Sequence, residues 1–105
     1  MITSTAARFA LETYKEIACG IVDRHVQKLS NGAFADKNEP AKEVILVFNR
    51  QVKMINEELS VQADYILSQT KLGMDTDKGK LKELLFLIRK DYFNEFLKKC
   101  ELSLQ

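Results

Sequence analysis

The chain has 105 residues, of which 46% are hydrophobic and 30% charged, which suffices for one domain with a core of its own. Sixteen basic residues stand against fifteen acidic ones, for a formal net charge of +1. This balance excludes the strong basic excess typical of proteins that bind phosphate backbones, so nucleic acid is not an expected partner. We expect a single domain over residues 1–105.

The sequence lacks the features of a membrane or exported protein. Its longest apolar runs, Val44–Phe48 and Leu84–Ile88, fall far short of the roughly 20 residues that a membrane helix needs. Met1–Ala10 contains no basic stretch followed by an apolar one, as a signal peptide would. These absences favour a cytoplasmic protein without membrane contact, in which Cys19 and Cys100 are reduced.

The first predicted element is a helix over about residues 5–30. Thr5 is a suitable N-cap, and Gly32 can end the helix. Apolar residues between them recur at spacings of three and four, which places them on one face of a helix. This face comprises Ala7, Leu11, Tyr14, Ala18, Ile21, His25 and Leu29. Gly20 interrupts the segment, and we expect it to mark either a close helix crossing or a bend.

The second predicted element is a helix over about residues 40–72. Pro40 suits a first helical turn, and Gly73 follows as a stop signal. The β-branched stretch Glu43–Phe48 resembles a strand, but the helical pattern continues on both sides, and a lone strand has nothing to pair with. The main face consists of Ala41, Ile45, Phe48, Val52, Ile55, Leu59 and Ile66.

The third predicted helix covers about residues 76–102, with a main face of Leu81, Leu84, Leu85, Ile88, Tyr92 and Phe96. Short connections make consecutive helices antiparallel. The fold class is therefore all-α, an elongated up-down-up three-helix bundle of coiled-coil character, with completion by dimerisation left open. In length and layout it resembles a spectrin-type repeat, but it has no tryptophan, which such repeats usually place in the core.

The bundle keeps the two cysteines apart. The first and third helices run parallel, and Cys19 lies nearer the start of its helix than Cys100 does. At 1.5 Å per residue the two differ in height by about 15 Å, beyond the reach of a disulfide. A bond between them within one chain would contradict the layout.

Helices two and three carry more apolar residues than one face needs. The additional residues either complete the core asymmetrically or form a surface that binds another protein or a second copy of the chain in a homodimer. Aromatic residues and methionine are enriched at the centres of such interfaces. The candidate partner-binding residues are Val47, Met54, Val61, Tyr65, Phe86, Phe93 and Leu97.

The only histidine allows a second hypothesis. His25 and Lys28 lie three residues apart on one side of a helix, and this pair resembles the motif of histidine-phosphotransfer domains, which are also small helical bundles. The resemblance implies a signalling carrier that is phosphorylated on His25. The sequence departs from that motif at Leu29, where such domains usually have glycine. His25 is also in register with the apolar face, which indicates an inward or boundary position.

Motifs for catalysis are absent from the sequence. Glu57 and Glu58 are adjacent, so their side chains diverge by about 100° on a helix, while the carboxylates of Asp75 and Asp77 suit a helix start. No E-x-x-H motif or glycine-rich phosphate loop is present. We therefore expect no enzyme, no cofactor and no metal, and the leading hypothesis is a helical protein–protein interaction module, such as an adaptor, a small chaperone or a subunit of a larger assembly.

A basic end of the bundle supports a third hypothesis, a weak nucleic-acid accessory protein. Six basic residues would gather at one end if the bundle is up-down-up. They are Arg24, Lys28, Lys37, Lys42, Lys98 and Lys99. Binding that falls steeply with added salt would be the mark of such a site.

Overall fold

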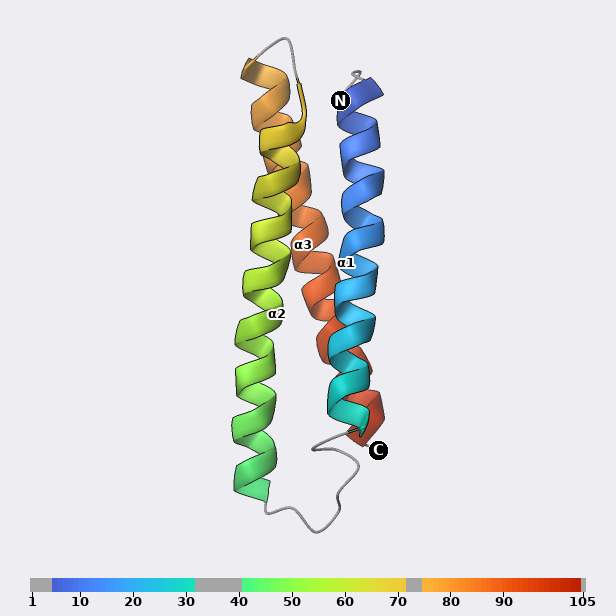
Figure 1. Ribbon diagram of the computed structural model, residues 1–105, viewed down its shortest axis with the longest axis vertical. Coiled ribbons are helices and arrows are strands. Elements are labelled where there is room, and N and C mark those ends of the chain that lie inside the picture. The colour runs from blue at the N-terminus through green and yellow to red at the C-terminus, as the bar shows by residue number, and fades with distance from the viewer. Residues whose placement is uncertain (1–4, 32–40, 72–74, 105) are drawn as a thin grey trace.

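The computed structural model describes residues 5–31, 41–71 and 75–104, which form three helices. The helices are α1 (Thr5–Asn31), α2 (Ala41–Gln69) and α3 (Asp75–Leu104). In Figure 1, α1 and α3 run downward and α2 runs upward. Consecutive helices are therefore antiparallel, which is the predicted up-down-up arrangement. It is elongated, measuring 56 × 18 × 17 Å. The predicted helix bounds are confirmed to within a few residues.

The core forms two clusters along the rod. The cluster near the start of α1 contains Ala7, Ala10, Tyr14, Ile66, Leu81 and Leu85. The cluster nearer its end contains Ala18, Ile21, Val22, Leu29, Ile55, Leu59, Phe96 and Cys100. The predicted face of α1 is buried throughout, apart from the half-buried Leu11, because its spacing of three and four keeps those side chains on the side that meets α2 and α3.

The third helix crosses obliquely behind the other two. In Figure 1 it passes from behind α2 at its beginning to behind α1 at its end. Ile45, predicted to be on the main face of α2, is instead 57% exposed. The oblique path of α3 accounts for this, because the beginning of α2 lies at the end of the bundle where α3 has moved toward α1.

The two cysteines and Gly20 lie at positions for which the sequence made specific predictions. Both cysteines are free thiols, Cys19 exposed and Cys100 buried. A close crossing at Gly20 is wrong, because a Cβ added there would meet nothing within 4 Å. The expected capping residues Gly32, Pro40 and Gly73 lie outside the described residues. Over the ranges that the structure describes, none of the helices combines the length and apolarity needed to cross a membrane.

Candidate functional site

A shallow groove of about 600 Å³ lies between the beginning of α1 and the end of α2. Ala10 and Ile66 form its buried floor, and Tyr65, on its α2 side, is 59% exposed. Polar side chains, among them Thr13 and Gln62, also line it. The groove therefore combines an apolar floor with hydrogen-bonding groups.

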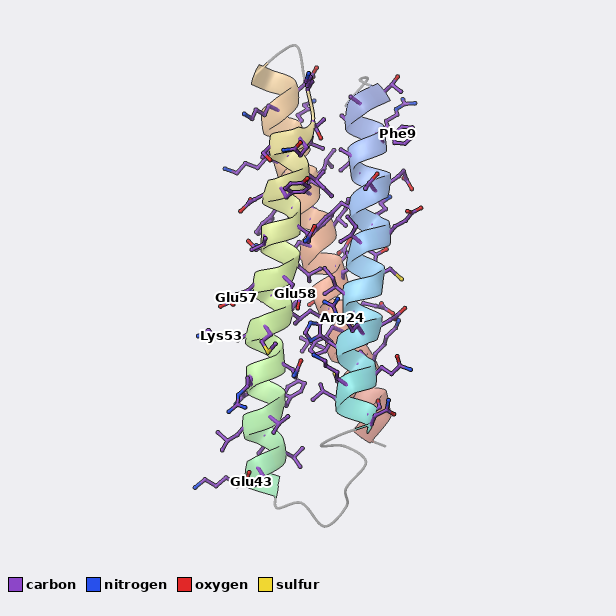
Figure 2. All side chains as sticks on the ribbon, in the orientation of Figure 1. Phe9, Arg24, Glu43, Lys53, Glu57 and Glu58 are labelled. Atoms are coloured by element: carbon purple, nitrogen blue, oxygen red, sulfur yellow. The ribbon has the colours of Figure 1, made fainter. Side chains whose placement is uncertain are left out.

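Phe9, which is not among the residues predicted to bind a partner, is the most exposed large apolar side chain described, at 73%. It borders this groove, and Figure 2 shows its ring projecting outward from α1. The sequence feature that could have identified it is a large aromatic residue outside the spacing of three and four residues that marks the buried face.

A second, smaller hollow of about 180 Å³ lies between α2 and α3. Leu67 of α2 and Leu85 and Phe86 of α3 line it, with Asp64, Lys82 and Arg89 among the other lining residues. The Arg89 guanidinium lies 4.8 Å from the centre of the Phe86 ring, within the range of a cation–π contact. Phe86 remains 52% exposed.

Two of the seven candidate partner-binding residues lie at different hollows. Tyr65 of α2 borders the α1–α2 groove, and Phe86 of α3 borders the α2–α3 hollow, while the other five line neither of these two hollows. Val47 and Phe93 are half-buried and pack against the core, as the core-completion alternative anticipates. The exposed members are Met54, Val61, Tyr65, Phe86 and Leu97.

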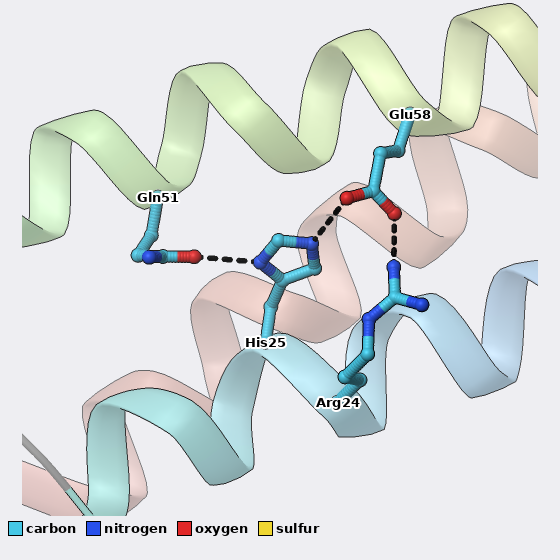
Figure 3. A network of polar contacts seen from close by, with 4 residues as sticks. All are labelled: Arg24, His25, Gln51 and Glu58. Atoms are coloured by element: carbon cyan, nitrogen blue, oxygen red, sulfur yellow. Dashed lines mark hydrogen bonds and ion pairs between the residues drawn. The ribbon is translucent and has the colours of Figure 1, made fainter.

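A polar network joins α1 to α2 in the middle of the bundle, beyond the groove (Figure 3). The ring of His25 is completely buried. Its Nδ1 lies 2.6 Å from Oε1 of Gln51, and its Nε2 lies 3.1 Å from Oε1 of Glu58. Both ring nitrogens thus contact side chains of α2, which compensates the cost of burying them.

Glu58 links this buried histidine to the surface. Its second carboxylate oxygen accepts a hydrogen bond from Arg24 of α1, so one carboxylate bridges a buried and an exposed group. Glu57 is exposed and points away from α1 in Figure 2. The predicted divergence of these adjacent glutamates is confirmed, since only Glu58 faces α1.

The burial of His25 bears on the phosphotransfer hypothesis. A phosphotransfer histidine must present a ring nitrogen to its partner, whereas both nitrogens of His25 are engaged by α2. Within the described residues, no group of three or more histidine, cysteine or acidic side chains is arranged to hold a metal ion.

The expected basic end is partly neutralised. Arg24 pairs with Glu58, and Lys99 pairs with Asp23 at 2.9 Å. The hydrogen bond from Lys99 to Asp23 raises the pKa of the lysine. Lys37 lies outside the described residues. These ion pairs tie α1 to its neighbours and leave fewer cations for a phosphate backbone.

Two buried groups elsewhere in the core have shifted pKa values. Burial raises the pKa of the Tyr14 hydroxyl to about 12, with a further raising effect from Asp64 and a lowering effect from Arg89. This hydroxyl donates a hydrogen bond to the backbone oxygen of Leu59 at 2.8 Å. Burial also raises the pKa of the Cys100 thiol to about 11, so both groups remain neutral and unreactive near pH 7.

The chain was not assigned to a family by comparison with known proteins. No protein-family model matches the chain, and neither the curated proteins nor the solved structures contain a significant match to it.

Proposed function

We propose that this chain is a non-enzymatic helical interaction module that binds another polypeptide along the flanks of α2. The observation that carries the proposal is the exposure of large apolar side chains on both flanks. Tyr65, at the α1–α2 groove, and Val61, one turn earlier, are about 60% exposed, and Phe86, at the α2–α3 hollow, is 52% exposed. A monomer rarely leaves contiguous apolar surface in water.

The chemistry of these side chains supports a protein partner. Tyrosine, phenylalanine and methionine are enriched at the centres of protein interfaces. Groups such as Thr13, Gln62 and Gln69 along the α1–α2 groove suit the polar rim of such a contact. A helical partner lying along the rod would bury the apolar side chains of one flank together.

Site-specific photocrosslinking in native extract tests this proposal. A photoreactive amino acid at position 65 or 86, each beside one of the two hollows, should yield adducts with a polypeptide, because a partner would cover those positions. The matched control is Leu87, which is 48% exposed but borders neither hollow described above. Absence of polypeptide adducts at both positions, or equal adducts at position 87, would refute the proposal.

A further inference from the structure

The exposed side of α2 carries a regular apolar row, whose last member, Tyr65, borders the α1–α2 groove. Val47, Met54 and Val61 follow one another at seven-residue intervals, and Tyr65 lies one turn beyond Val61. This is the spacing of one position in a coiled-coil heptad. Met54, Val61 and Tyr65 are exposed, while Val47 is half-buried. Three of its four members are therefore not covered by α1 or α3, whereas Val47, at the beginning of the row, packs partly against the core.

A second row, of charged residues, lies three positions after the apolar one along α2, and one of its members, Asp64, also lines the α2–α3 hollow. From the start of α2 onward they are Glu43, Arg50, Glu57 and Asp64, with Lys71 just beyond the helix. All five are exposed, and none forms an ion pair with another of the described residues. Apart from Glu57, the charges alternate along the chain as negative, positive, negative and positive. In the reverse direction the order is positive, negative, positive and negative, so a second copy that runs antiparallel presents the opposite charge at each position.

That sign order makes the row complementary to itself in the antiparallel sense. With a two-fold axis beside Glu57, Arg50 lies near Asp64 of the second copy, and Glu43 lies near Lys71 of the second copy. The same axis brings Met54 near Val61 of the second copy and Val47 near its Tyr65. In a parallel pair, each of these charges would face its own copy, and like charges opposite one another are unfavourable.

From these observations we infer that the occupant of this row is a second copy of the chain, bound through antiparallel pairing of α2 with α2. The inference rests on the proposed function, because it names the partner of one of the two flanks. A two-fold interface of this kind forms each contact twice. At the axis Glu57 lies opposite its own copy, so the antiparallel pair has one like-charge contact against four opposite-charge contacts, whereas the parallel pair would have five like-charge contacts. Figure 2 shows Glu57 and Lys53, which lies one turn earlier, projecting away from α1.

Sedimentation equilibrium over a concentration series tests the pairing. The parent chain should show a monomer–dimer equilibrium. Arg50→Glu and Asp64→Arg should each weaken the dimer by roughly tenfold to a hundredfold, because two ion pairs become two like-charge contacts. An equimolar mixture of the two variants should restore association, since the heterodimer regains both opposite-charge contacts. A parent that stays monomeric, or a mixture no tighter than its components, would overturn the inference.

Disulfide crosslinking tests the direction and register of the pairing independently. In a Cys19→Ser background, Glu57→Cys should crosslink rapidly to itself across the axis. Glu43→Cys should not crosslink to itself, but should crosslink to Lys71→Cys when the two are mixed. Self-crosslinking at position 43 would indicate parallel pairing and overturn the inference. If the pure chain is monomeric while position 65 still crosslinks another polypeptide in extract, this inference fails and the proposed function survives.

Discussion

The contact between α1 and α2 and the contact between α2 and α3 are built from different interactions. Four polar contacts join α1 to α2, from Tyr14 to Leu59, from His25 to Gln51 and Glu58, and from Arg24 to Glu58. Between α2 and α3, the rings of Phe48 and Phe96 lie nearly parallel, with centroids 6.2 Å apart and an interplanar angle of 6°.

The two kinds of interaction have different roles: polar contacts fix the position of one helix along another, and apolar packing stabilises the fold. Hydrogen bonds are directional and fail when donor and acceptor move apart by an ångström, so the polar contacts fix α1 along the length of α2. Ring packing tolerates small displacements but removes much apolar area from water. We therefore expect the apolar packing around Phe96, which involves α1 as well as α2, to contribute more to the free energy of unfolding, and the polar contacts between α1 and α2 to specify the arrangement.

The largest effect is expected at the α2–α3 contact. Phe96 is fully buried, so Phe96→Ala should lower the free energy of unfolding by about 3–5 kcal/mol through lost burial and the cavity left behind. Urea denaturation followed by circular dichroism measures this. The control is Leu87→Ala, at an exposed position on the same helix, which should change stability by about 0.5 kcal/mol or less. Equal losses in the two variants would contradict the packing described.

The sequence predicted the helices because their apolar spacing is a local property. The faces of α1 and α3 follow from intervals of three and four residues, and the structure confirms them. The exposure of Ile45 could not be derived in this way, because it depends on the angle at which α3 crosses the bundle. Periodicity gives the orientation of a side chain on its own helix, but not the path of the neighbouring helix.

The candidate site was predictable only in part, for a similar reason. Exposed Tyr65 and Phe86 were identified as surplus to one face, but their assignment to opposite flanks of α2 required the packing order of three helices. The pairing of Arg24 with Glu58 joins residues 34 positions apart, and no local pattern marks such a pair. The inward position of His25 was predicted, whereas its partners on α2 were not.

An intermediate effect is expected for the buried tyrosine at the α1–α2 contact. Tyr14→Phe removes the hydroxyl that donates to Leu59, and should lower the free energy of unfolding by about 1–2 kcal/mol at pH 7. Chemical denaturation of parent and variant measures the difference. No change would mean that water replaces this hydrogen bond at no cost.

The same residue predicts an alkaline transition. Because folding raises the pKa of Tyr14 from 10.0 to about 12, the folded state holds this proton more tightly, and stability falls as the pH rises from about 10 to about 12. Tyr14→Phe lacks this contribution, so its stability should decline less than that of the parent over that range. Parallel decline of the two proteins would show that ionisation of Tyr14 does not drive the alkaline loss.

The smallest effect is expected for the exposed ion pair between Arg24 and Glu58. Its coupling energy tests whether this polar contact contributes little to stability, as we infer. A double-mutant cycle with Arg24→Ala and Glu58→Gln should give a coupling energy of about 0.2–1 kcal/mol, since exposed pairs are screened by water. Added salt should reduce it further. Glu58→Gln keeps an oxygen that can accept from His25, so its buried bond survives while the charge is lost. If this coupling energy exceeded the loss in the free energy of unfolding measured for Phe96→Ala, the ion pair would contribute more to stability than the apolar packing. The roles assigned to the two kinds of interaction would then be reversed.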